Sequence, residues 1–183
     1  CPCANAWAGR SIVTPVPSML ENGVTVGLGT DGGLTNDSLD MMHAMNFAAL
    51  IHKVNYGGIG AMTAERVLEM STIGAAKALR LDGIIGSLEP GKRADLVIVD
   101  LKSLGMTPHM LPVKNLIYSA NSSSVESVMI DGEFVLKERE FTSLNLEETL
   151  KEGERTAWRL LENSGHLERY PGFLKRGGYS YIG

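Results

Sequence analysis

The chain has 183 residues, of which 44% are hydrophobic and 21% charged, a composition typical of a globular protein with a buried core. Its formal net charge of -4 argues against a general nucleic-acid surface, because such surfaces need clustered Lys and Arg. No apolar run reaches the ~20 residues of a membrane span, and the first residues lack the basic and apolar regions of a signal peptide, so we expect a cytoplasmic protein that does not bind membranes.

Both cysteines lie at the beginning of the chain, as Cys1 and Cys3. A single intervening residue leaves little room for a disulfide, and the second pair that a structural zinc site would need is missing. The chain does not begin with Met. We therefore expect a processed, truncated or excised piece of a longer protein.

The first half of the chain predicts three helices around one strand. Apolar residues at helical spacing, with prolines in the first turn, predict a helix over Arg10–Asn22. The β-branched run Gly23–Asp31 predicts a buried strand. Two further helices are predicted over Leu39–Lys53 and from Thr63, as N-cap, to Leu79. Helices alternating with a strand are typical of a parallel α/β sheet.

The second half predicts a small β unit followed by a helix. A short strand and a Pro-Gly turn are predicted within Ile84–Arg93, and further short strands at Ala94–Asp100, Val113–Ser119, Val125–Ile130 and Glu133–Leu136. The pair Asp131-Gly132 predicts a tight hairpin turn between the last two. A charged amphipathic helix is predicted over Leu144–Ser164. The chain thus divides into three predicted parts, residues 1–82, 83–142 and 143–183.

The strongest chemical signal is Asp31, which follows the predicted strand directly and precedes Gly32 and Gly33. A carboxylate at the exit of a parallel strand lies where α/β folds place their chemistry. The alternative is that Asp31 caps the next helix or lies in a turn. Similarly, Asn36 and Asp37 either contact a substrate or cap the helix that begins near Leu39.

Several motifs, in this order and spacing, resemble the amidohydrolase superfamily. The segment Val24–Asp40, V-T-V-G-L-G-T-D-G-G-L-T-N-D-S-L-D, is similar to the last barrel strand of its aminohydrolase branch, which includes deaminases and triazine hydrolases. The opening Cys1–Asn5 resembles the segment after the seventh strand. Leu88–Asp100, Asn115–Ala120 and Val128–Gly132 resemble the small β-sandwich domain of the superfamily.

This resemblance implies an α/β fold: the C-terminal part of a (β/α)8 TIM-type metal-dependent hydrolase barrel plus part of a small composite β-sandwich. It implies a divalent metal, zinc or alternatively iron, with Asp31 as both metal ligand and catalytic proton shuttle. Asn36 is the candidate substrate contact. The other metal ligands of the superfamily, mostly histidines on earlier strands, would lie outside this chain. Ala4 stands where the superfamily has Ser, which removes any contact made by that hydroxyl.

The remaining candidate ligands do not form a cluster in the sequence. His43 and His52 lie nine residues apart on one predicted helix, too far to share a face as a ligand pair, so surface or supporting roles are expected. His109 lies in a loop and His166 in the polar tail. The nearby methionines are expected to fill the core (Met41, Met42 and Met45).

Two functions from different classes follow. In the first, the chain is part of an enzyme that hydrolyses C–N or C–Cl bonds of a small nitrogen heterocycle through metal-activated water. It would be inactive alone and would need the missing N-terminal barrel portion. In the second, it is a non-catalytic structural or interaction fragment. Unpaired barrel edges would then favour association with a partner or, as a homo-oligomer, with another copy.

Overall fold

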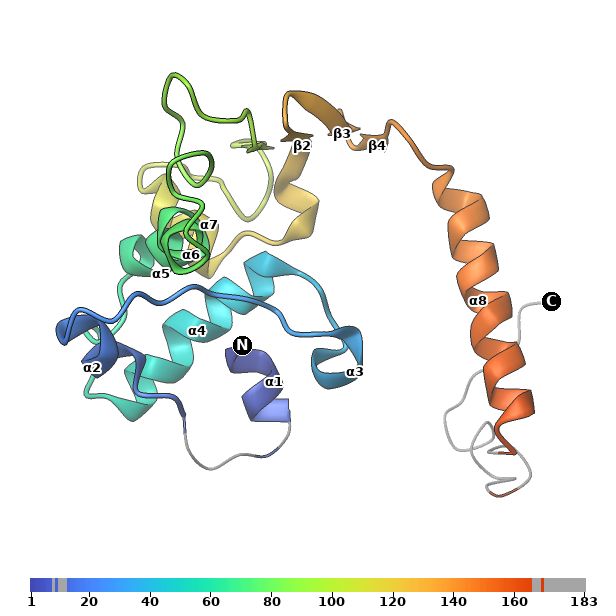
Figure 1. The fold of residues 1–183 in the computed structure, drawn as a ribbon, viewed down its shortest axis with the longest axis horizontal. Helices are drawn as coiled ribbons and strands as arrows, with labels where there is room; N and C mark the ends of the chain where they lie inside the picture. Colours follow the sequence, from blue (N-terminus) through green and yellow to red (C-terminus); the bar gives the residue numbers. More distant parts are fainter. Residues whose placement is uncertain (8, 10–12, 166–168, 170–183) are drawn as a thin grey trace. The chain divides into compact units, whose positions relative to one another are not determined.

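The computed structural model describes residues 1–7, 9, 13–165 and 169, and Figure 1 shows their arrangement. The helices of the first part are α1 (Pro2–Trp7), α2 (Val16–Glu21), α3 (Gly33–Asn36), α4 (Met41–Asn55), α5 (Ala64–Ser71) and α6 (Ile73–Ala78). They are followed by β1 (Leu96–Val99), α7 (Pro112–Tyr118), the 3₁₀ turn η1 (Ser122–Ser124), β2 (Val125–Ile130), β3 (Glu133–Lys137), β4 (Glu140–Phe141) and α8 (Leu146–Asn163). None of the described helices is long and apolar enough to cross a membrane.

Helix α4 lies at the centre of the helical part and contacts α1, α5 and α7 (Figure 1). Its N-cap is Asp40, whose carboxylate accepts hydrogen bonds from the backbone N–H groups of Met42 and His43. The core around it is rich in methionine and includes Met42, Met45, Met62, Val67, Met70 and Ile117, so the prediction holds for Met42 and Met45, whereas Met41 is only half-buried. The flexible thioether side chain suits such gaps between short helices.

The predicted helix from Thr63 to Leu79 is divided into α5 and α6. Thr63 caps α5 as expected, because its hydroxyl accepts a hydrogen bond from the Arg66 backbone N–H at 3.2 Å. The helix is interrupted at Thr72, whose hydroxyl donates to the Leu68 carbonyl at 2.7 Å and competes with the regular backbone pattern. Sequence spacing alone did not predict this break.

Residues 24–30 cross the helical part as an irregular segment, so the strand predicted over Gly23–Asp31 does not form (Figure 1). The one sheet of the described residues consists of β1 to β4 and does not include this segment. A strand requires a neighbouring strand for its hydrogen-bond ladder, and none lies beside residues 23–32 in this part of the chain. The segment is instead held by helices: the Leu28 N–H donates to the Met70 carbonyl at 3.0 Å.

The sheet has the order β1-β2-β3-β4, and its first three strands pair antiparallel. The predicted hairpin turn is confirmed between β2 and β3, where Asp131 and Gly132 both have positive φ, 52° and 86°.

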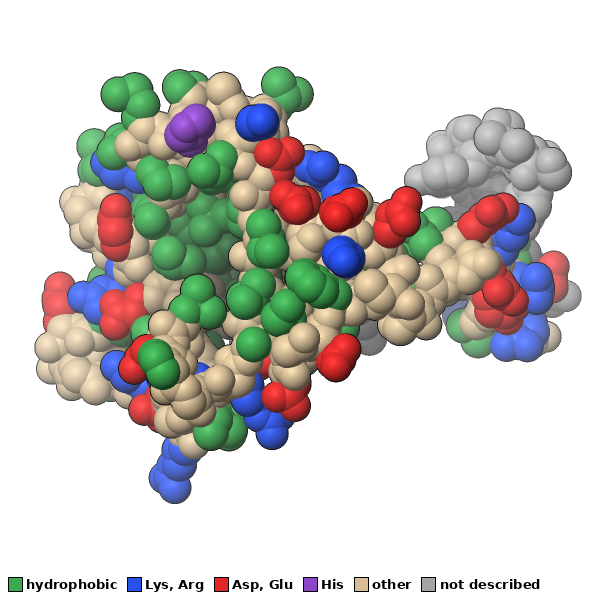
Figure 2. Space-filling view, turned by 90° about the horizontal axis from the view of Figure 1, so that it is seen from above, with side chains coloured by type: hydrophobic (Ala, Val, Ile, Leu, Met, Phe, Trp, Pro, Cys, Tyr) green, Lys and Arg blue, Asp and Glu red, His purple; other side chains and the backbone are tan. Residues whose placement is uncertain are grey.

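Figure 2 shows hydrophobic side chains gathered on the face seen from above. The exposed apolar side chains of this part of the chain include Val97, Ile98 and Leu104.

The strands predicted within Ile84–Arg93 and over Val113–Ser119 are wrong. Residues Ile84–Arg93 form turns, which include the predicted turn at Pro90-Gly91, and the Arg93 N–H donates to the Ile84 carbonyl. The predicted strand Val113–Ser119 is the helix α7, which begins at Pro112 in the first helical position. Apolar residues at positions 113, 116 and 117 have helical spacing, and Ile117 is fully buried against the helices.

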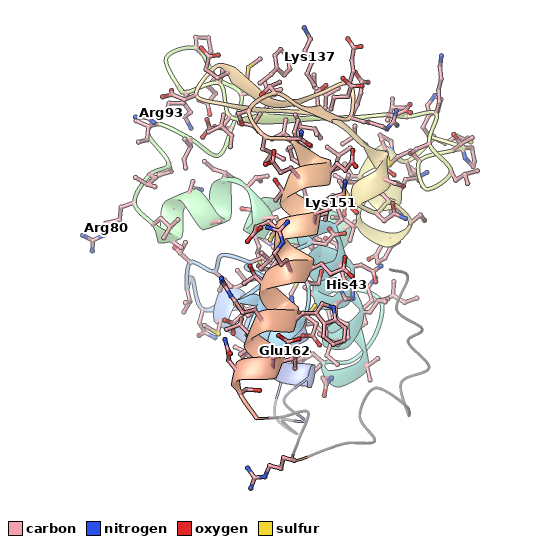
Figure 3. All side chains as sticks on the ribbon, turned by 90° about the vertical axis from the view of Figure 1, so that its right-hand side faces the viewer. His43, Arg80, Arg93, Lys137, Lys151 and Glu162 are labelled. Carbon is pink, nitrogen blue, oxygen red and sulfur yellow. The ribbon has the colours of Figure 1, made fainter. Side chains whose placement is uncertain are left out.

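The chain separates into two compact units, Cys1–Glu140 and Phe141–Gly183. In the second unit, α8 begins at the N-cap Asn145, whose side chain accepts from the Glu148 N–H at 3.1 Å. Lys151 and Glu162 project from this helix (Figure 3), and Lys151 pairs with Glu147 one turn away. The helix confirms the prediction over Leu144–Ser164 with slightly narrower bounds. The division at residues 82 and 83 stays a prediction.

Candidate functional site

The candidate site is built on the segment that leads to Asp31. Val26 and Leu28 pack against the core and thereby fix the direction of the segment. Gly27 allows a close approach to α6: a Cβ there would lie 3.0 Å from Cα of Ala75. The segment is thus anchored on one side before it reaches Asp31, which is exposed.

Asp31 itself has a constrained geometry. Its φ of 65° lies in the left-handed region, which is uncommon for a residue with a side chain. Its Oδ1 accepts a hydrogen bond from the backbone N–H of Gly32 at 2.7 Å. No described residue donates to Oδ2, so this oxygen is available to a ligand. The carboxylate therefore presents one oxygen outward while the other holds its orientation.

Asn36 is the last residue of α3, five positions after Asp31, and it is buried, with 7% of its surface exposed. Its side-chain amide donates to the carbonyl of Thr30 at 2.9 Å and to that of Ser38 at 2.8 Å. The prediction that Asn36 or Asp37 caps the following helix is wrong, because Asp40 is the cap. Asp37 instead ends α3 in a left-handed conformation with φ 52°. The predicted substrate contact of Asn36 stays a prediction.

The donor atoms near Asp31 fit a metal only in part. A carboxylate oxygen is a normal zinc ligand, but a zinc site needs about four ligands. The described residues contain no group of three or more His, Cys, Asp or Glu that could hold a metal ion. Among the described residues, Asp31 therefore has no partner ligands that would complete a zinc site.

None of the described histidines belongs to a group of possible metal ligands with Asp31. His43 is exposed on α4 (Figure 3). His52 is not at the surface: it is 3% exposed, with Nδ1 2.7 Å from the Ala48 carbonyl and Nε2 3.3 Å from the Thr14 carbonyl. His109 lies in the loop before α7, and His166 lies outside the described residues.

A separate cavity of about 230 Å³ lies between α1, the segment before Asp31 and α4. It is mainly apolar, and its lining includes Val26, Leu28, Ile51, His52 and Met70. Nearby, burial raises the pKa of the Cys3 thiol, so Cys3 is an inert core residue, and both cysteines are free. Asp31 is not among the residues that line this cavity.

Residues 1–135 match the model of the amidohydrolase family, and the chain belongs to that family. It is 42% identical over 149 residues to a 5-methylthioadenosine/S-adenosylhomocysteine deaminase of Syntrophomonas wolfei, a match that covers 81% of this chain and 35% of the deaminase. The chain thus spans about a third of the length of such relatives.

Two solved structures share its fold. An adenosine deaminase from Xanthomonas campestris with bound zinc superposes with a TM-score of 0.83 and 33% identity, over 87% of this chain and 36% of the deaminase. An atrazine chlorohydrolase from Arthrobacter aurescens complexed with zinc gives a TM-score of 0.75 and 25% identity, over 82% and 33% of the two chains. The fold class implied by the sequence resemblance, part of an amidohydrolase barrel with a small β unit, is confirmed.

The sequence did not predict how the loop after Asp31 is held. The capping role of Asp40 had a signal, because an aspartate directly precedes the apolar residues of α4. The two bonds made by Asn36 had none, since they join residues six and two positions away through a loop whose shape depends on the left-handed Asp31 and Asp37.

Proposed function

We propose that this chain forms part of a metal-dependent aminohydrolase and supplies one metal ligand, Asp31, to its active site. The complete enzyme would hydrolyse the C–N bond that joins an amino group to a nitrogen heterocycle. The observation that carries this proposal is the fixed, exposed carboxylate of Asp31, in a chain 42% identical over 149 residues to a deaminase.

The role of Asp31 follows from the chemistry of hydrolysis. A divalent metal, when bound, lowers the pKa of water to about 7 and so makes a nucleophile available near neutral pH. Asp31 contributes a carboxylate oxygen to that metal. Its carboxylate also takes the proton that water loses as it attacks the ring carbon, and then gives this proton to the leaving amino nitrogen. The Gly32 N–H holds Oδ1, so the side chain keeps one orientation for both tasks.

The proposed substrate is a small 6-aminopurine nucleoside. The two deaminases described above act, by their names, on adenosine or its 5′-substituted derivatives, and they are 42% and 33% identical to this chain. Removal of chlorine from a triazine is the second candidate reaction, supported by the atrazine chlorohydrolase at 25% identity. The higher identity to the deaminases favours deamination.

The proposed metal is zinc, with iron as the alternative. Zinc is bound in the deaminase and in the chlorohydrolase that share this fold. A carboxylate oxygen such as that of Asp31 suits a divalent metal of this kind. The other ligands would be supplied by the part of the barrel that is not among the described residues, in the same polypeptide or as a separate partner.

A direct contact of Asn36 with substrate is not part of this proposal. The side chain is 7% exposed, and its amide nitrogen already donates to two backbone carbonyls. A cytoplasmic location is part of the proposal and is compatible with the two free thiols.

A structural or interaction role is the remaining alternative. The segment 23–32 has no neighbouring strand among the described residues, and α8 exposes Leu146, Leu150 and Leu160. Such surfaces favour association with a partner or with a second copy. Association and catalysis are compatible, because an incomplete barrel must associate or be continuous with its remainder in order to be active.

The experiment compares the complete enzyme with its Asp31→Asn variant. Turnover of adenosine, 5-methylthioadenosine and atrazine would be measured together with bound zinc and iron. We expect deamination of the nucleosides, at least one equivalent of metal, and a loss of turnover in the variant of about 10²–10⁴-fold, the usual contribution of a general acid–base group. Normal turnover in the variant would remove Asp31 from the mechanism. The isolated chain is expected to be inactive.

A further inference from the structure

We propose that Asn36 is a positioning residue for Asp31, a proposal that rests on the function proposed above. Its side-chain amide holds the peptide group that precedes Asp31, and this sets the direction in which the carboxylate projects. Asn36 would therefore act on metal binding and turnover through Asp31, without contacting the substrate.

The contacts of Asn36 are directed at both ends of the loop that carries Asp31. The amide nitrogen lies 2.9 Å from the carbonyl oxygen of Thr30 and 2.8 Å from that of Ser38. The first carbonyl belongs to the same planar peptide group as the N–H of Asp31. Because Asn36 is 7% exposed while Asp31 is exposed, these bonds are shielded from water and the carboxylate is not.

These bonds restrict the torsion angles that decide where the carboxylate lies. With the preceding peptide plane fixed by Asn36, the position of the Asp31 Cβ depends on φ, which is 65°. On the other side of Cα, the Gly32 N–H bonds to Oδ1 at 2.7 Å and restricts the side-chain rotation. A left-handed aspartate is intrinsically unfavourable and persists only when its surroundings impose it. Two side chains restrict it: Asn36 donates to the Thr30 carbonyl, and the Thr30 hydroxyl donates to the Asp31 carbonyl at 3.0 Å.

The loop between the two carbonyls is closed internally as well. The backbone N–H and the hydroxyl of Thr35 both donate to the Gly32 carbonyl, at 3.0 and 3.1 Å. The loop of residues 30–38 is therefore held by its own hydrogen bonds and, at both ends, by the bonds of Asn36 to the Thr30 and Ser38 carbonyls. Side chains that orient a metal ligand typically change metal affinity or activity by 10–100-fold when they are removed.

The first test is a double-mutant cycle on zinc affinity in the complete, metal-free enzyme, measured by competition with a chelator. Asn36→Ala should weaken zinc binding about 10–100-fold when Asp31 is present. In the Asp31→Asn background the same change should alter affinity by no more than about twofold, the usual error of additivity for independent sites. Equal losses in both backgrounds would mean that Asn36 acts through general stability and would overturn the proposal.

The matched control is Asn115, whose amide also donates to two backbone carbonyls, those of Met106 and Pro108, at 2.9 and 2.8 Å. Asn115→Ala removes the same number of bonds at a loop that does not carry Asp31. It should leave zinc affinity within about twofold of the original enzyme. A loss as large as that of Asn36→Ala would overturn the proposal.

The second test separates positioning from substrate contact. Asn36→Leu keeps about the size of the side chain and removes the donor without adding a charge, so a folded variant is expected even if Asn36→Ala is unstable. A positioning role predicts a fall in kcat of about 10–100-fold with KM nearly unchanged. A rise in KM with unchanged kcat would identify Asn36 as a substrate contact and overturn the proposal. Failure of the function proposed above would be recognised separately, because Asp31→Asn would then leave metal binding and turnover intact.

Discussion

Replacement of Asp31 by different residues should separate its structural role from its chemical role. Its φ of 65° costs a residue with a Cβ about 1–2 kcal/mol, and the bond from Gly32 N–H to Oδ1 offsets part of this with about 0.5–1.5 kcal/mol. Asn tolerates the left-handed region and keeps an acceptor oxygen, so Asp31→Asn should change the free energy of unfolding by less than about 0.5 kcal/mol.

Two other replacements, Asp31→Gly and Asp31→Ala, separate the backbone strain from the lost hydrogen bond. Asp31→Gly loses the acceptor but has no Cβ to strain, so the two effects nearly cancel, and stability should change by less than about 1 kcal/mol. Asp31→Ala loses the acceptor and keeps the strain, so it should destabilise by about 1–3 kcal/mol. All three should lose turnover to a similar extent, because none of them retains a carboxylate to transfer a proton.

The assay is urea unfolding of the metal-free complete enzyme, beside nucleoside turnover of the metal-loaded enzyme. Removal of the metal matters, because bound metal would add its own binding free energy to the measured stability. If turnover instead followed stability, with Asp31→Asn and Asp31→Gly as active as the original, the carboxylate would be structural. Asp31 would then have no catalytic role, whatever its geometry.

Three further predictions concern the scaffold. Asp40→Ala removes the N-cap of α4 and should lower the free energy of unfolding by about 0.5–2 kcal/mol in urea, with no loss if the cap is unimportant. Gly105→Ala should destabilise by about 1–3 kcal/mol, because its Cβ would lie 2.5 Å from the Ser119 carbonyl oxygen; an unchanged midpoint would contradict this packing. Arg139 bonds to Asp100 and holds the pKa of that carboxyl below its usual value. The resulting stability is present above the unfolded pKa and is lost as pH falls through the folded one, so Arg139→Ala should make acid unfolding begin at higher pH.

Local features were predicted well where a short stretch of sequence decides the structure. The cap at Thr63 and the turn at Asp131-Gly132 depend on neighbouring residues alone, and both are confirmed. The strand predicted over Val113–Ser119 failed because a short apolar run fits either period, and the tertiary contact of Ile117 with the buried core favours the helix.

Features that depend on distant parts of the chain were not predictable. The left-handed conformation of Asp31 and the bonds of Asn36 depend on how residues 30–38 close into a loop. No periodicity or composition signals such a closure. For the candidate site, the sequence therefore suggested Asp31 as the residue that would carry the chemistry, and the structure was needed to suggest what holds that residue in place.

The failed strand and the lack of further ligands for the proposed metal would have one common explanation. Residues 23–31 have the sequence of a buried strand but no neighbouring strand within the described residues, and the proposed ligand Asp31 belongs to no group of three or more possible metal ligands there. In a closed barrel, adjacent strands supply both the hydrogen-bond ladder and the side chains that converge at the strand ends. Because the chain covers 35% of its deaminase relative, the remaining strands of such a barrel would complete the ladder and the metal site in the same step. We therefore expect metal binding and ordering of residues 23–31 into a strand to be acquired together when the barrel is complete.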